Sequence, residues 1–286
     1  MKKNIFLTVI LGIASILIIF FGRQYANNQE EEMLQNSLSA NDTNESEGEG
    51  STTSEQAAPD ALSTEEKLAE YESNLDSLSI LETIDYTTLT NDQARLAYYG
   101  PIDTSLEWYG QMNTIIQDNV SGPLEIEEYT YPETDTYELY IQRTVDTVVE
   151  SGANVVIYRM PALEDKNRDI GLSETNQYLT SIMNALTEGL PDTEIFFMEP
   201  APILSEFDNP NSRSLSYRSY MNEMNSVASE FGIPVIAIHD QFTTLAEEEG
   251  LELDSLFDEE QTNLNDQGNT LIQQAIESEV SNTTDE

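Results

Sequence analysis

Five short apolar runs, separated by longer amphipathic segments, most constrain the fold of this 286-residue chain. Each run is a nearly continuous, β-rich stretch, which is typical of a parallel strand buried on both faces. Strand alternating with helix predicts a parallel sheet covered by helices on both sides. The predicted strands span residues 95–99, 124–129, 154–160, 194–198 and 234–238. The predicted helices span residues 105–119, 135–150, 173–188, 212–231 and 266–279. We therefore expect a three-layer α/β/α sandwich with a five-stranded parallel sheet.

The N-terminal segment differs in composition from the rest of the chain. Lys2 and Lys3 precede an apolar run over 5–21, and the sequence after Arg23 has no small-x-small cleavage site. This pattern favours an uncleaved transmembrane anchor, with the remainder of the chain outside the cell membrane. The following polar stretch is too poor in apolar residues to form a core. The predicted parts are a cytoplasmic stub at 1–4, a transmembrane anchor at 5–22 and a disordered acidic linker at 23–62.

The folded part is expected to begin at residue 63. Ser63 and Glu66 have the spacing of a capping box, and apolar residues then recur at helical spacing, which predicts a helix over 64–82. The predicted parts are a leading segment at 63–90, a sandwich domain at 91–280 and a tail at 281–286.

Charge and residue usage exclude several functions. The chain has 11 Lys and Arg against 54 Asp and Glu, a formal charge of −43. Such a field repels nucleic acid, and the sequence contains neither a phosphate-binding glycine loop nor a basic patch. It has no cysteine, and His239 is its only histidine. Thiolate and multi-histidine metal sites are therefore excluded, and we expect no metal, no cofactor and no nucleic-acid partner.

The sequence before the final predicted helix resembles the last motif of the SGNH/GDSL hydrolases. That motif is Asp-x-x-His, an apolar residue, Asn, two polar residues and Gly. Leu264, Asn265 and Gly268 fit its frame, which places Asn263 at the family's histidine and Glu260 at its aspartate. A carboxamide cannot accept a serine proton at pH 7 as imidazole does.

Two earlier stretches resemble further blocks of the same family. Residues 96–105 are similar to the strand and Gly-Asp-Ser of the first block, and 162–165 lie where the family has Gly-x-Asn-Asp. The resemblance covers roughly 92–280 and implies an SGNH-hydrolase-like, flavodoxin-like sandwich. It places the family's nucleophile position at Ile102 and its oxyanion-binding asparagine at Glu164. The glycine expected after the second strand is missing.

Displaced groups offer an alternative catalytic set. Thr104 and Ser105 carry nearby hydroxyls, and His239 follows the fifth strand at the ligand-binding edge of a parallel sheet. Alternatively, Thr104 or Ser105 caps the helix that begins near Leu106, and His239 is structural. The candidate catalytic residues are Thr104, Ser105, His239, Glu260 and Asn263.

Residues around the ends of the first and third strands are candidates for ligand binding. Trp108 could stack on a sugar or pack in the core, and residues 164–168 could instead be a solvated loop. The candidate ligand-binding residues are Gly100, Asp103, Trp108, Glu164 and Asn167.

Together these features predict a membrane-anchored, extracytoplasmic SGNH/GDSL hydrolase-like protein that is catalytically degenerate. It would bind cell-envelope glycans or their esters, or assist in modifying them. Two alternatives stay open. One is an active serine or threonine ester hydrolase or acyltransferase with a relocated triad, and the other is a non-catalytic scaffold.

Overall fold

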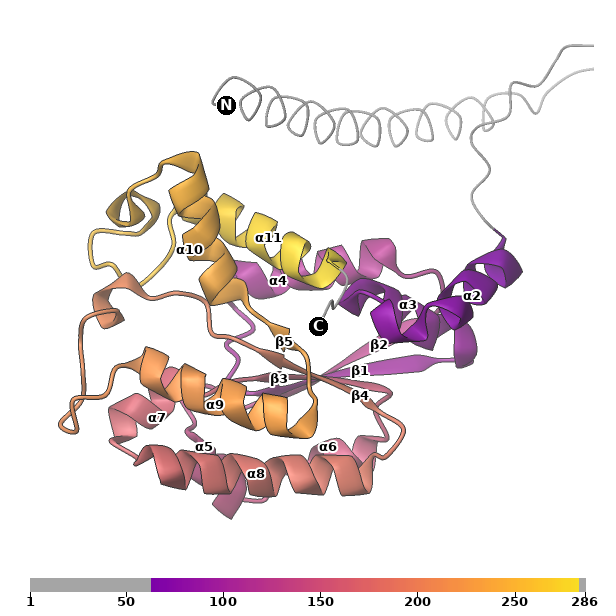
Figure 1. Ribbon diagram of the computed structural model, residues 1–286, viewed down its shortest axis with the longest axis horizontal. Helices are drawn as coiled ribbons and strands as arrows, with labels where there is room; N and C mark the ends of the chain where they lie inside the picture. The colour runs from indigo at the N-terminus through magenta and orange to yellow at the C-terminus, as the bar shows by residue number, and fades with distance from the viewer. Residues whose placement is uncertain (1–62, 283–286) are drawn as a thin grey trace, which may run out of the picture. The chain divides into compact units, whose positions relative to one another are not determined.

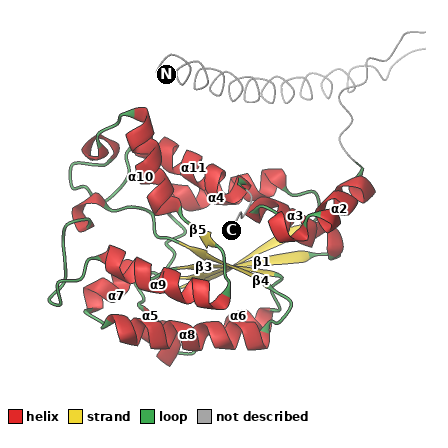
Figure 2. Cartoon of the chain, in the orientation of Figure 1, coloured by secondary structure: helices red, strands yellow, loops and turns green. Residues whose placement is uncertain are grey.

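A computed structural model describes residues 63–282, in which five parallel strands form one sheet in the order β2-β1-β3-β4-β5. The strands are β1 (Ala94–Gly100), β2 (Leu124–Thr130), β3 (Val155–Arg159), β4 (Glu194–Met198) and β5 (Val235–Ile236). Figure 2 shows them enclosed by helices. The predicted α/β fold with a five-stranded parallel sheet is confirmed.

The predicted anchor lies outside the described residues, together with the stub and the linker. Residues 283–286 of the predicted tail lie outside them as well. Between residues 63 and 282, no helix has both the length and the apolar character needed to span a membrane.

Helices cover both faces of the sheet (Figure 1). Successive side chains of β1 point to opposite faces, so Leu96 and Tyr98 enter one core while Ala97 and Tyr99 enter the other. The first core is closed by α3 (Ile80–Thr90), α4 (Glu107–Asn119), α10 (Ile238–Glu249) and α11 (Asp266–Ser281). The second is closed by α5 (Thr136–Ile141), α6 (Val145–Ser151), α7 (Ala162–Arg168), α8 (Leu172–Gly189) and α9 (Tyr217–Phe231).

Several predicted elements need correction. β2 is an edge strand and is not buried on both faces, since none of its residues is fully buried. The helix predicted over 135–150 is two helices, and Arg143 between them has a left-handed φ of 54°. The fifth strand stops at Ile236, and α10, which was not predicted, begins at Ile238.

The predicted leading helix is also divided. The capping box of Ser63 and Glu66 is present and starts α2 (Thr64–Ser73), but the helix ends there. A short 3-10 turn, η1 (Leu75–Ser77), follows, and a second capping box formed by Ser79 and Glu82 starts α3. A capping residue in the middle of the apolar pattern therefore breaks one predicted helix into two.

Asp85 ties these helices to the sandwich. Its buried carboxylate accepts the Tyr71 hydroxyl at 2.9 Å and the Ser121 backbone N–H at 2.5 Å, and it pairs with Lys67 at 2.5 Å. Because Tyr71 and Lys67 belong to α2 and Ser121 follows α4, one carboxylate joins three segments.

Candidate functional site

The position expected for the family's nucleophile is part of the hydrophobic core. Ile102 follows β1, and its N–H donates to the Gly100 carbonyl at 2.9 Å. Its side chain is 0% exposed and belongs to the same core as Trp108 and Met112 of α4. A ligand above the strand ends therefore cannot reach this side chain without opening the core.

An ion pair lies at the carboxyl ends of β1 and β3. Arg159 Nη1 donates to the Pro101 carbonyl and to Glu164 Oε1, each at 2.7 Å, and the two charged side chains are only 10% and 12% exposed. Gly100 has a φ of 116°, and a Cβ there would lie 2.6 Å from the Arg159 carbonyl oxygen. The backbones are thus packed closely at the point where ligands of such sheets usually bind.

Glu164 faces Arg159 at the position expected for an oxyanion donor. A carboxylate accepts hydrogen bonds and repels a developing oxyanion. The loop alternative for 164–168 is wrong, because these residues belong to α7. Asp165 is fully buried there and accepts from the Thr136 N–H at 2.7 Å and the Thr175 hydroxyl at 2.6 Å. Asn167 is on the exposed side of α7.

The two displaced hydroxyls make no contact with this ion pair. Ser105 Oγ donates to Asp103 Oδ1 at 2.6 Å, and hydrogen bonds from Ser105 lower the pKa of Asp103, which makes that carboxylate a weaker base. Neither Thr104 nor Ser105 caps α4, because its N-cap is Leu106, which makes no side-chain cap. Thr104 and Ser105 instead line an open depression of about 540 Å³ that also includes Gln273 of α11. Trp108 is buried.

The residues of the last motif have structural roles at the start of α11. Asn263 Nδ2 donates to Asp258 at 3.0 Å, while Glu260 is exposed and makes no ion pair within the described residues. Asn265 accepts the backbone N–H groups of Gln267 and Gly268 and thereby caps α11. A Cβ on Gly268 would lie 2.2 Å from the Leu256 carbonyl oxygen.

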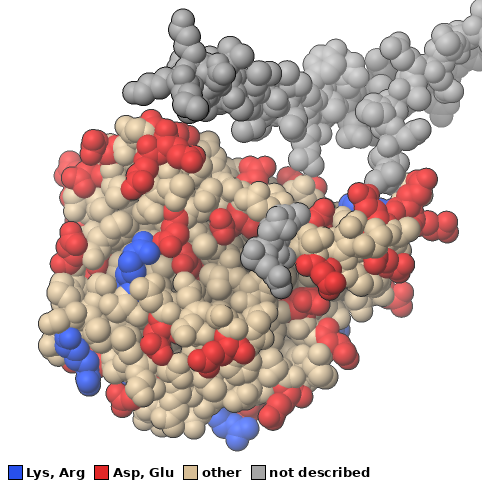
Figure 3. Space-filling view, viewed as in Figure 1, with Lys and Arg blue, Asp and Glu red and all other residues tan. Residues whose placement is uncertain are grey.

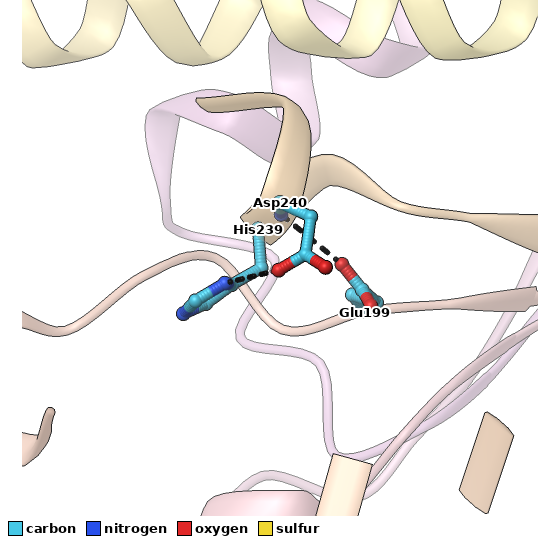
Figure 4. Close-up of side chains that lie close together, drawn as sticks. All are labelled: Glu199, His239 and Asp240. Carbon is cyan, nitrogen blue, oxygen red and sulfur yellow. Dashed lines mark hydrogen bonds and ion pairs between the residues drawn. The ribbon is translucent and has the colours of Figure 1, made fainter. Parts of the chain in front are cut away.

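His239 belongs to a second polar cluster at the ends of β4 and β5 (Figure 4). Glu199 follows β4, while His239 and Asp240 open α10, and their ligand atoms lie within 4.8 Å of one another. His239 Nδ1 lies 3.2 Å from Asp240 Oδ1, and Nε2 lies 2.5 Å from the hydroxyl of Tyr217 on α9.

Arg218 supplies the positive charge of this cluster. Its guanidinium lies 3.1 Å from His239 Nδ1 and 2.8 Å from Asp240 Oδ1. Imidazole and carboxylates are metal ligands, but here a cation of the protein itself contacts two of the three. Burial lowers the pKa of His239 to about 4, so its imidazole is neutral at pH 7. Burial also raises the pKa of Tyr217, which keeps that hydroxyl protonated.

The structure keeps His239 apart from Thr104 and Ser105. Three strand spacings separate the ends of β1 and β5, roughly 14 Å at about 4.8 Å per spacing. Within residues 63–282, no hydrogen bond joins Thr104 or Ser105 to His239 or Asn263.

The sequence interpretation missed Arg159, Glu199, Tyr217 and Arg218. A signal existed for Glu199, because it follows a predicted strand and His239 follows the next one, which places both at one edge of the sheet.

Glu199 makes stability depend on pH. Burial, followed by the nearby charge of Asp240, raises its pKa to about 7. A carboxyl whose folded pKa is raised binds its proton more tightly in the folded state. The stability that this protonated carboxyl contributes is therefore lost as pH rises from about 4.5 to about 7. We expect Glu199→Gln to raise the free energy of unfolding at pH 8 by about 2 kcal/mol and to change it little at pH 5. Urea denaturation at both pH values measures this, and an equal effect at both would contradict the assignment.

Cations are few and paired. Acidic side chains are far more common than basic ones on the surface seen in Figure 3. Each lysine and arginine of the described residues forms an ion pair with a carboxylate. This part of the chain therefore has no unpaired cation for an anionic ligand.

Comparison with known proteins shows which solved structures share this fold. No family model and no curated protein matches this sequence. A GDSL-like lipase from Parabacteroides merdae matches with a TM-score of 0.51 and 10% identity, over 66% of this chain and 96% of that chain. The lipase/acylhydrolase from Enterococcus faecalis matches with a TM-score of 0.50 and 11% identity, over the same shares. An acetyl xylan esterase matches with a TM-score of 0.49 and 14% identity, over 64% and 98%. The predicted SGNH/GDSL hydrolase-like fold is confirmed.

Proposed function

We propose that this chain is a membrane-anchored, extracytoplasmic SGNH/GDSL hydrolase-like protein that no longer hydrolyses esters. It binds cell-envelope glycans, or assists in modifying them or their esters. The observation that supports the loss of hydrolysis best is the burial of Ile102, the residue at the family's nucleophile position. Glu164 and Asn263 point the same way, since each is engaged with another side chain. The Glu164 carboxylate has no N–H to donate to an oxyanion, and the Asn263 carboxamide cannot act as the base.

The effect of these replacements on catalysis is large because the groups act together. Loss of one triad member commonly leaves only residual catalysis, and much of that remaining activity comes from the oxyanion hole. Here the nucleophile, the base and an oxyanion donor are replaced together. The oxyanion hole, which would support the remaining activity, is therefore weakened too.

A neutral glycan fits the electrostatics better than a polyanion. The chain carries a formal charge of −43, and each described cation is already paired. An anionic polymer would meet repulsion without compensating contacts. The predicted anchor over 5–22 would hold the domain beside envelope glycans.

One observation favours the alternative of an active ester hydrolase. Ser105 Oγ donates to Asp103 at 2.6 Å and lines an open depression large enough for a small ester. In this alternative Asp103 would serve as the base, against its lowered pKa.

An esterase assay separates the two. We expect the full chain to hydrolyse p-nitrophenyl acetate, butyrate and octanoate no faster than buffer at pH 7 and pH 9. Ser105→Ala and Thr104→Ala serve as matched controls. Hydrolysis by the unaltered chain that Ser105→Ala abolishes would refute the proposal and establish the alternative.

A further inference from the structure

Three tyrosine rings form an aromatic patch on the layer that covers the second core, with Tyr140 exposed and the other two half-buried. The Tyr140 ring of α5 stacks on Tyr178 of α8 at 5.2 Å and 22°, and Tyr137 meets Tyr178 at 5.3 Å and 59°. Tyr140 is 42% exposed and the adjacent Ile141 is 56% exposed. We refer to Tyr137, Tyr140, Ile141 and Tyr178 as the tyrosine patch. Figure 1 shows α5 and α8 side by side.

The hydroxyl groups of these rings are available for hydrogen bonding. Within residues 63–282, the hydroxyls of Tyr137, Tyr140 and Tyr178 make no hydrogen bond to the protein. By contrast, the Tyr109 hydroxyl donates to Glu128 and the Tyr220 hydroxyl to the Ile170 carbonyl. The patch therefore combines an apolar surface with free groups that donate and accept hydrogen bonds.

Charged groups beside the rings add one free acceptor. The Arg168 guanidinium carbon lies 5.1 Å from the Tyr137 ring centroid, and Nη1 donates to Asp135 at 2.8 Å and to Glu138 Oε1 at 2.7 Å. The Glu138 side chain is 38% exposed, and its second oxygen makes no hydrogen bond within the described part of the chain. Arg168 is thus committed to two carboxylates, while Glu138 can still accept a hydroxyl.

We infer that the tyrosine patch binds a neutral pyranose sugar, with the C–H-rich face of the sugar on the outer face of the Tyr140 ring. Tyr178 covers the other face of that ring, so the exposed part of Tyr140 is its outer face and edge. The sugar hydroxyls can donate to Glu138 and exchange hydrogen bonds with the free tyrosine hydroxyls. This inference rests on the proposed glycan-binding function and assigns it a surface.

Size and charge favour a sugar over other occupants. A stable protein interface buries about 1,600 Å² in total, whereas a few half-buried aromatic side chains offer on the order of a few hundred Å². A polyanion would need an unpaired cation, and the patch has none. The patch also lies across the sheet from Thr104 and Ser105, which adjoin α4 and α11.

Calorimetric titration of the full chain with xylotetraose and with the tetramer of N-acetylglucosamine tests the assignment. We expect binding of at least one sugar, weakened about tenfold or more by Tyr140→Ala and by Tyr178→Ala, in line with the loss of one aromatic contact. Tyr140→Phe should retain most of the affinity, because it keeps the ring. Tyr86→Ala, which alters a half-buried tyrosine of α3 in the opposite layer, should leave binding unchanged.

The outcomes separate the surface from the function. Sugar binding that both alanine variants retain would overturn the tyrosine patch and leave glycan binding standing. Absence of binding to either sugar by the unaltered chain would overturn both. Self-association in sedimentation that Tyr140→Ala abolishes, with sugar binding unchanged, would assign the patch to a second copy of the chain. Circular dichroism spectra that match the unaltered chain would verify that the variants are folded.

Discussion

The Ile102→Ser variant, which puts a hydroxyl at the family's nucleophile position, is expected to lose about 4 kcal/mol of unfolding free energy and to gain no esterase activity. Shortening a buried isoleucine removes apolar contacts and leaves a cavity, at a cost of roughly 2 to 5 kcal/mol for truncation to alanine. The serine hydroxyl would be buried in an apolar cluster, which adds about 1 to 3 kcal/mol unless it finds a partner. Urea denaturation of the full chain measures the loss.

Ile102→Val is the matched control, because it removes one methyl group and adds no polar atom. It should cost about 1 kcal/mol. If Ile102→Ser were as stable as Ile102→Val, the position would be open to solvent and the argument from burial would fail. Ester hydrolysis by the serine variant would show that the remaining groups still form a catalytic site.

The sheet was predictable because each strand carries its own signal. The run Ile195–Met198 is apolar, lies between Glu194 and Glu199 and is too short for a helix, and the predicted limits of 194–198 match the observed strand. Parallel order follows from the helices between the strands. By contrast, the end of β5 could not be read from the pattern, because Ala237 and Ile238 continue the apolar run while the backbone already turns into α10.

The site was less predictable because its geometry depends on contacts between distant residues. Ile102 was identified as lacking a nucleophilic atom, yet its burial depends on α4 packing over it. The interaction of Arg159 with Glu164 depends on α7, which was interpreted as a loop because Glu164 to Arg168 are charged or polar. Lys166 is nevertheless buried and pairs with Glu206, so tertiary contacts override the polar character of this segment.

The Glu164→Ala variant is expected to lose about 3 to 5 kcal/mol of unfolding free energy, because it leaves the buried Arg159 guanidinium without its carboxylate. Replacing both charges should be less harmful than replacing one. In Arg159→Met with Glu164→Ala neither charge of the pair remains, and the methionine can fill much of the arginine's volume. We expect the double variant to recover about 2 kcal/mol, reduced by the lost bond to the Pro101 carbonyl.

Guanidinium chloride denaturation of the single and double variants gives the coupling energy directly. Glu164→Gln, which keeps the shape and one acceptor, should fall between the unaltered chain and Glu164→Ala. A double variant no more stable than Glu164→Ala would mean that Arg159 stabilises the fold through its own contacts, such as the bond to the Pro101 carbonyl. Recovery would mean that Glu164 is needed there chiefly to neutralise Arg159, which is a structural task that the family's asparagine could not perform.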